Sequence, residues 1–177
     1  IPEADFHLLN GRAKMITKMP IRLLSLSMLD LHNRGVFWDI GFCTGSVSVE
    51  AKLQFPHLHI VAFEQRTEGK QLLHDNSRRF GTPGIEAVTG DFTQVDTGVY
   101  ACPDAVFIGG HGGKMNEIIE KVSGCLAENG VIVFNSVSEE SRCLLLDALA
   151  GNSLRLVQTI RIQTGDFNAI DVMKATR

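Results

Sequence analysis

Short apolar runs alternate with amphipathic stretches along most of this chain. Apolar runs of this length are typical of strands buried on both faces, and the stretches between them have helical periodicity. This alternation predicts an α/β fold in which helices cover both faces of a parallel sheet. The predicted strands are 36–40, 59–64, 85–91, 105–110 and 130–135, and the predicted helices are 46–54, 68–79, 114–127 and 139–149.

A further helix is predicted before the first strand. Apolar residues at 21, 24, 28 and 31 follow the helical period, Thr17 is a suitable N-cap, and Pro20 falls in the first turn, where proline is tolerated. At the last helix, Ser136 and Glu139 have the spacing of a capping box. These residues mark where the first and last helices are expected to begin.

The C-terminal end of the chain has a different pattern. Apolar and polar residues alternate over 154–162, and a second run, NAIDVMKA, covers 168–175. Both are typical of strands, and the turn residues Thr164, Gly165 and Asp166 separate them. With no room for a helix between them, these strands are expected to finish the parallel sheet as an antiparallel hairpin.

Length and composition are those of one ordinary globular domain. The chain has 177 residues, of which 44% are hydrophobic and 21% charged. We expect residues 1–35, a basic segment and a helix, to form a single domain with residues 36–177. The chain does not begin with Met, which suggests a domain cut from a longer protein.

Two further absences in the sequence narrow the class of protein. No apolar run is long enough to span a bilayer, and the four cysteines lack both C-x-x-C spacing and histidines at zinc-ligand spacing. A reduced, cytoplasmic protein with no metal and no membrane partner is therefore expected.

Charge is distributed unevenly along the chain, although the net charge is only −3. Residues 12–22 carry four cations, Arg12, Lys14, Lys18 and Arg22, and no acid, so the remaining residues carry a net −7. An acidic body disfavours nucleic-acid binding, which needs a basic face across the domain. A local cationic segment instead favours a site for a polyanionic small molecule.

The segment VFWDIGFCTGS (36–46) contains the first candidate site. Its apolar strand ends at Asp39 and runs through Gly41, Cys43 and Gly45 into a helix. Glycines at this point let the backbone turn tightly and approach a ligand at the carboxyl end of the strand. The same glycines are also compatible with a simple strand-to-helix turn.

Acidic residues end the next two strands. Glu64 comes 19 residues after Gly45, where a carboxylate can accept hydrogen bonds from both hydroxyls of a ribose. Asp91 follows Gly90 and can accept from an adenine amino group or cap the next turn. Three successive strand ends with a carboxylate and flanking glycines predict a ligand that contains adenosine.

The glycine spacing distinguishes between adenosine ligands. A dinucleotide fingerprint, G-x-G-x-x-G, fails at Cys43 and Ser46. The pattern D-x-G-x-x-x-G from Asp39 to Gly45 instead resembles the first motif of class I S-adenosylmethionine-dependent methyltransferases, most of which have Gly where Cys43 stands. This resemblance implies a Rossmann-like α/β fold with a mostly parallel seven-stranded sheet and a C-terminal antiparallel hairpin.

Four stretches resemble one subfamily: MITKMPIR (15–22), NSRRFG (76–81), DAVFIGGHGG (104–113) and VIVFNSV (131–137). Together they are similar to the CbiT family of cobalamin biosynthesis, which also occurs as the C-terminal half of the fused precorrin-6Y methyltransferase CobL. The resemblance implies methylation at carbon 15 of a precorrin, precorrin-7 or a cobalt-precorrin, with loss of carbon dioxide from the ring-C acetate. It also implies a homo-oligomer, usually a tetramer, and a fused or separate C5-methyltransferase partner.

The same resemblance assigns the candidate site residues. His111 and Asn135 are the catalytic candidates, although His111 is also explained as an exposed loop histidine and Asn135 as a strand cap. Lys18 and Arg22 match the family pattern T-K-x-x-x-R and are candidates for pairing with substrate carboxylates, although a solvated helix face also explains them. The expected substrate contacts are Lys18, Arg22, Gly110, His111, Gly112 and Gly113, and the expected cofactor contacts are Thr17, Asp39, Gly41, Cys43, Thr44, Gly45, Glu64, Gln65, Asp91, Phe92 and Gly109.

Two other functions remain open on the sequence. A tRNA-modifying or other small-molecule methyltransferase would share the fold, but an RNA enzyme needs a broad basic surface that this acidic body does not provide. A non-catalytic domain that binds S-adenosylhomocysteine and serves in assembly would keep the pocket without turnover.

Overall fold

Seven strands form one mixed sheet in the computed structural model, which describes residues 1–12, 14–165 and 168–177. The strands are β1 (Val36–Ile40), β2 (His59–Glu64), β3 (Ile85–Thr89), β4 (Ala105–Ile108), β5 (Val131–Ser136), β6 (Arg155–Ile162) and β7 (Ile170–Thr176). Their order across the sheet is β3-β2-β1-β4-β5-β7-β6. The pairs among β1 to β5 are parallel, whereas β7 is antiparallel to both β5 and β6. The predicted parallel sheet with a C-terminal antiparallel hairpin is therefore confirmed.

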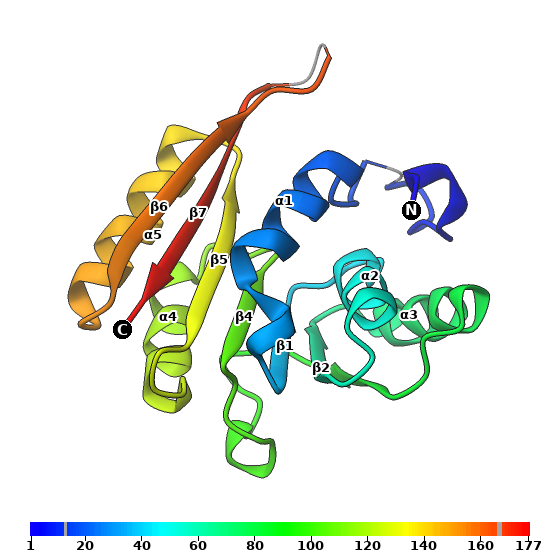
Figure 1. Cartoon of the computed structure of the whole chain (residues 1–177), viewed down its shortest axis with the longest axis horizontal. Coiled ribbons are helices and arrows are strands. Elements are labelled where there is room, and N and C mark those ends of the chain that lie inside the picture. The colour runs from blue at the N-terminus through cyan, green and yellow to red at the C-terminus, as the bar shows by residue number, and fades with distance from the viewer. Residues whose placement is uncertain (13, 166–167) are drawn as a thin grey trace.

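Helices cover both faces of this sheet. They are α1 (Met19–Leu29), α2 (Ser46–Gln54), α3 (Thr67–Phe80), α4 (Met115–Cys125) and α5 (Glu139–Gly151), with short 3-10 turns at Glu3–Asp5, Leu31–Asn33 and Thr97–Val99. Figure 1 shows α1 and α2 on one side of the sheet and α4 and α5 on the other. None of the helices within the described residues is long and apolar enough to cross a membrane.

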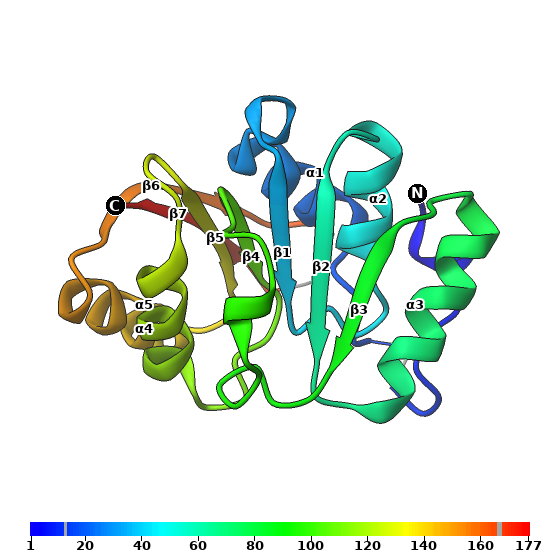
Figure 2. The ribbon, with the colours of Figure 1, turned by 90° about the horizontal axis from the view of Figure 1, so that it is seen from below.

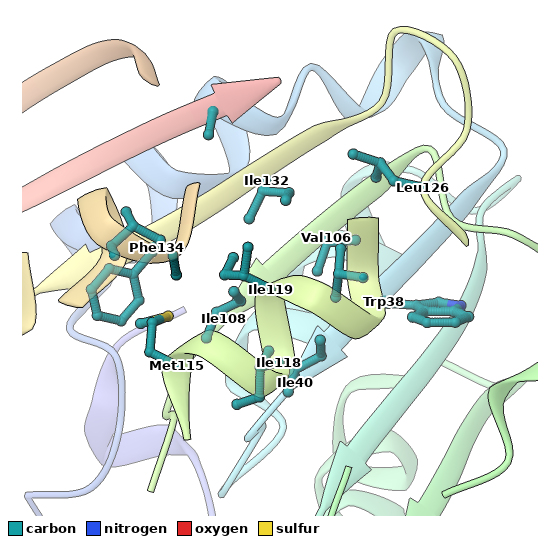
Figure 3. Close-up of a cluster of buried hydrophobic side chains, with 14 of the residues drawn as sticks. Trp38, Ile40, Val106, Ile108, Met115, Ile118, Ile119, Leu126, Ile132 and Phe134 are labelled. Atoms are coloured by element: carbon teal, nitrogen blue, oxygen red, sulfur yellow. The ribbon is translucent and has the colours of Figure 1, made fainter. Parts of the chain in front are cut away.

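The larger part of the core lies between the sheet and helices α4 and α5. Figure 3 shows apolar side chains of β1, β4 and β5 packed against Met115, Ile118 and Ile119 of α4. Trp38, which is fully buried, packs edge-on against the rings of Phe63 and Phe92, at centroid distances of 5.2 and 6.1 Å. Because both faces of the central strands are buried, their sequences are mostly apolar, and the polar residues lie toward their carboxyl ends.

The starts of two helices differ from the prediction. The N-cap of α1 is Lys18, not Thr17, and the carboxylate of Glu3 accepts a hydrogen bond from the Met19 N–H, so a distant acid caps the first turn. At α5 the capping box is formed by Ser138 and Ser141. Ser136 cannot be the cap because it is the last residue of β5, and its hydroxyl donates to the Ser138 carbonyl.

The C-terminal hairpin extends past the end of the other strands in Figure 1. Its predicted antiparallel pairing is confirmed, and a shift in register separates Leu156 from Gln158. Of the predicted turn residues, Thr164 and Gly165 are described, whereas Asp166 lies outside the described residues.

The order of strands reverses next to β1. Figure 2 shows β1 between β2, which follows it in the sequence, and β4, which is separated from it by two strands and two helices. The loops that leave β1 and β4 therefore lead to helices on opposite faces of the sheet. A crevice opens between such loops at the carboxyl ends of the strands, and ligands of open α/β sheets bind there.

Candidate functional site

A cavity of about 570 Å³ lies at the carboxyl ends of β1 to β5. Residues 14–18, before α1, and residues on both sides of the hairpin turn, including Ile162 and Ile170, contribute to its walls. The structure thus brings together most of the residues predicted for the site. They are Thr17, Lys18, Asp39, Gly41, Cys43, Glu64, Gln65, Asp91, Phe92, Gly109, Gly110, His111, Gly112 and Asn135.

Two glycine backbones in contact form the floor of the cavity. Gly41 has a φ of +74°, and a Cβ added there would lie 2.7 Å from the Gly110 carbonyl oxygen. A Cβ on Gly109 would lie 2.9 Å from the Gly41 carbonyl oxygen. Any side chain at either position would therefore force the β1 and β4 loops apart.

Cys43 occupies a backbone conformation that favours glycine. Its φ is +52°, in the left-handed region, which is uncommon for a residue with a side chain. Burial raises the pKa of the Cys43 thiol, and the nearby Glu64 carboxylate raises it further. The thiol is therefore kept protonated and poorly nucleophilic at neutral pH.

Glu64 is a buried carboxylate held in one orientation. It is 2% exposed, and its Oε2 accepts from the Cys43 N–H at 2.9 Å. Its Oε1 accepts from the N–H and the guanidinium of Arg66 at 3.0 and 2.9 Å. A Cβ on Gly69 of α3 would lie 2.6 Å from the Glu64 Cγ, so a glycine is needed there. Arg66 and Gly69 were not predicted, although a glycine inside a helix is itself a signal of close packing.

Asp91 forms an ion pair at the edge of the cavity. Its Oδ1 accepts from the Thr93 N–H and hydroxyl at 3.0 and 2.9 Å, and its Oδ2 accepts from Lys114. The Lys114 hydrogen bond is the main cause that lowers the pKa of Asp91, and Asp91 in turn raises the pKa of Lys114. Lys114 also lines the cavity, a role that its position at the start of a helix did not reveal.

The glycine-rich loop after β4 fixes the ring of His111. The Gly113 N–H donates to His111 Nδ1 at 3.2 Å, so a neutral ring carries its proton on Nε2. The ring packs edge-on against Phe134, with centroids 6.0 Å apart. Gly112 and Gly113 have φ values of +54° and +84°, which let the loop fold back to make this bond.

Asn135 is held from behind by α1. The hydroxyl of Ser25, which is fully buried, lies 3.0 Å from Asn135 Oδ1 and also donates to the Ile21 carbonyl at 2.8 Å. The amide nitrogen of Asn135 makes no hydrogen bond to the described residues, and the side chain lines the cavity. It is therefore available to a ligand as a donor.

Four predicted residues do not line the cavity. Arg22 is fully buried and pairs with Glu50, so as placed it cannot contact a substrate carboxylate. Thr44 is buried, and its carbonyl accepts from the Asn76 amide at 2.8 Å. Gly45 is the N-cap of α2, and Gly113 contributes its N–H to His111.

Asp39 is the most unusual carboxyl group in the site. It is fully buried, its Oδ2 accepts from the Ser48 hydroxyl at 2.6 Å, and its Oδ1 has no partner among the described residues. Burial raises the pKa of Asp39 to about 7, and Glu64 adds to this shift. Asp39 is one of the residues that line the cavity, and a buried carboxyl group with an unpartnered oxygen suits a cationic or hydrogen-bond-donating part of a ligand.

Together, the strand order and the antiparallel C-terminal strands define a class I methyltransferase fold. The model of the precorrin methyltransferase domain matches residues 10–175, and the chain belongs to that family.

Curated relatives agree with this assignment. A protein of Salmonella typhimurium named cobalt-precorrin-6B C(15)-methyltransferase (decarboxylating) is 38% identical over 162 residues, which cover 92% of this chain and 83% of that protein. A Sinorhizobium protein named precorrin-6Y C(5,15)-methyltransferase [decarboxylating] is 33% identical over 144 residues, which cover 80% of this chain and 34% of that protein.

A solved structure also matches nearly the whole chain. The crystal structure of precorrin-6Y C5,15-methyltransferase from Geobacter metallireducens has a TM-score of 0.83 and 29% sequence identity. The match covers 99% of this chain and 95% of that chain. The resemblance to the precorrin methyltransferases inferred from the sequence motifs is therefore confirmed.

The pKa of Asp39 leads to a prediction about stability. The folded chain holds this proton more tightly than the unfolded chain, in which the pKa is 3.8. The free energy of unfolding should therefore fall as pH rises from about 4 to about 7, by about 4 kcal/mol from this group. Asp39→Asn keeps an acceptor for Ser48 and removes the ionisation.

Urea unfolding at about pH 5 and about pH 8 measures this difference. Relative to the wild type, Asp39→Asn should be more stable by about 2 to 3 kcal/mol at the higher pH than at the lower one. Glu140→Gln, at the exposed start of α5, controls for the loss of one surface carboxylate. An equal difference in stability at both pH values would contradict the assignment.

Proposed function

We propose that this chain methylates carbon 15 of a precorrin and removes carbon dioxide from its ring-C acetate, with S-adenosylmethionine as methyl donor. The observation that carries the proposal is that a single cavity combines the Glu64 carboxylate, the glycine floor and the His111 loop, in a member of the precorrin methyltransferase family.

The described residues fit the proposed cofactor. Gly41 and Gly109 line the cavity without side chains, and Glu64, although bonded on both oxygens, keeps lone pairs for ribose hydroxyls. The unpartnered Asp39 oxygen suits the cationic amino group of a methionine moiety. When bound, the cofactor supplies an electrophilic methyl group, and the protein supplies its position.

The rim of the cavity fits a carboxylated macrocycle. Lys14, Lys18 and Lys114 line it as cations, while Ile162 and Val137 offer apolar surface beside them. A volume of about 570 Å³ is that of a drug-sized ligand, so the cofactor fills most of it and the macrocycle enters by one edge. Acetate and propionate groups at that edge would then pair with the lysines.

The proposed reaction needs the protein to position the reactants and to supply a proton after decarboxylation. Methyl transfer would form a carbon–carbon bond at carbon 15 and break the bond between the methyl carbon and the sulfonium sulfur, so that S-adenosylhomocysteine leaves and the methylated macrocycle loses a proton. Decarboxylation breaks the bond between the acetate carbons, releases carbon dioxide and leaves the electron pair delocalised in the ring until a proton is taken up. We assign the delivery of that proton to His111, which lines the cavity with its ring packed against Phe134.

A mass measurement tests the reaction. Incubation with S-adenosylmethionine and either precorrin-7 or cobalt-precorrin-6B should give a product that has gained a methyl group and lost carbon dioxide. The two incubations also show which metallation state is used. Binding of S-adenosylhomocysteine without any change in precorrin mass would contradict the proposal and favour the non-catalytic alternative. The homotetramer and the C5-methyltransferase partner stay predictions.

Glu64→Gln tests the ribose assignment. The variant keeps the shape of the side chain and loses its charge, so S-adenosylmethionine should bind more weakly by about 1.5 to 3 kcal/mol. Isothermal titration calorimetry measures the change. Glu86→Gln, on the exposed side of neighbouring β3, is the matched control. Equal binding isotherms for Glu64→Gln and the wild type would refute the assignment.

His111→Ala tests the separation of the two chemical steps. If His111 delivers the proton, methylation should continue while decarboxylation slows by about a hundredfold, since general acid catalysis contributes rates of that order. Single-turnover mass spectrometry would then detect a methylated product that still carries its acetate. Unchanged rates of both steps would leave His111 without a catalytic role.

A further inference from the structure

Arg22 is a fully buried arginine whose bonds all go to other parts of the chain. Its Nε donates to Glu50 on α2, and its Nη1 donates to the Thr17 carbonyl at 2.5 Å. Its Nη2 donates to the carbonyl of Ile1, and its guanidinium carbon lies 5.2 Å from the centre of the Phe6 ring. The guanidinium group is therefore held by hydrogen bonds from all three of its nitrogens and by the Phe6 ring.

One of these bonds reaches the wall of the cavity. Thr17 and Lys18 belong to the segment 14–18, whose members all line the cavity. The segment precedes α1, and its last residue, Lys18, is joined to the helix because the Lys18 carbonyl accepts from the Arg22 N–H at 2.8 Å. The Thr17 carbonyl is held by the side chain of Arg22, one turn into the helix.

Glu50, the acidic partner of Arg22, lies on the helix that follows the floor of the cavity. Glu50 is 5% exposed and lies on α2, the helix that begins directly after the glycine loop at Gly41 and Gly45. The Arg22–Glu50 pair thus connects the segment that forms one wall with the helix that rises from the floor. Glu50 also pairs with the amino group of Ile1, at 3.1 Å from its Oε1. The Arg22–Glu50 pair tolerates little movement, because separating it leaves the buried Arg22 without a counter-charge.

We propose that Arg22 is a positioning residue that, paired with Glu50, holds the segment 14–18 in place as a wall of the ligand cavity. The effect of this positioning on ligand binding rests on the proposed function, in which Thr17 contacts the cofactor and Lys18 contacts the substrate. The role differs from the carboxylate-binding one suggested by the sequence, because Arg22 acts through the backbone of Thr17 and not on a ligand.

Two variants separate this role from simple stabilisation. Arg22→Lys keeps the charge opposite Glu50 but lacks the fork that reaches the Thr17 carbonyl. The double variant Arg22→Met with Glu50→Leu removes both charges and keeps apolar volume, a change that often leaves stability unaltered or raises it. Arg34→Lys is the matched control, because Arg34 donates to the Asn129 carbonyl at 2.9 Å beside the amino ends of β1 and β5.

The experiment has two readouts, both taken well below the lowest melting temperature of the set. Hydrogen exchange without ligand should be about tenfold faster for amides of 14–18 in both Arg22 variants, and unchanged in the central strands. Calorimetry should show S-adenosylhomocysteine binding about tenfold more weakly to them than to the wild type and to Arg34→Lys.

Each result has a definite meaning. Faster exchange confined to the segment, together with weaker binding, supports the proposal. Unchanged exchange in the segment, or unchanged affinity despite faster exchange, overturns it. If the wild type binds no S-adenosylhomocysteine, the proposed function fails, and the exchange measurement alone decides whether Arg22 places the segment.

Discussion

The backbones that follow β1 and β4 touch each other, and the arrangement of the site depends on this contact. Gly41 lies against Gly110, and Gly109 lies against the Gly41 carbonyl, at distances that leave no space for a side chain. Because the two loops belong to adjacent strands that lead to helices on opposite faces, their separation sets the width of the crevice. The same separation determines where the His111 loop, which follows β4, lies relative to Cys43, which follows β1.

At Glu64, on neighbouring β2, a glycine again permits a close approach between two elements. The absence of a side chain at Gly69 lets α3 approach β2 until its backbone meets the Glu64 side chain. The carboxylate is then bonded to the Cys43 N–H, so the ends of β1 and β2 form one rigid unit. Gly69 lowers the intrinsic stability of α3, but its lack of a side chain allows the Glu64 carboxylate to be held in one position at the end of β2.

The sequence was informative wherever a residue's environment follows from the local pattern. Strands buried on both faces are mostly apolar, so β1, β2, β4 and β5 were predicted within a residue or two at most boundaries. The glycine spacing after β1 led to the fold, and the motif 104–113 led to the family. The Glu64 and Asp91 positions followed because parallel strands end at the same edge of the sheet.

Features that depend on distant partners were not predictable. Arg22 looked like a surface cation because its partner, Glu50, lies 28 residues further along the chain. Glu3 caps α1 across 16 residues, and Lys114 meets Asp91 across 23. The cationic segment is consequently less uniform than its sequence indicates, since Arg22 is neutralised inside the protein while Lys14 and Lys18 line the cavity.

The place of β7 has a consequence for how the chain folds. It is the last strand in the sequence, yet it lies between β5 and β6 and pairs with both. Until it is synthesised, β5 has an open hydrogen-bonding edge and β6 has no neighbour. Such an edge is a template for pairing with other chains. The sheet is therefore completed only once β7 has been made, and a chain cut before β7 exposes β5 as an aggregation-prone edge strand.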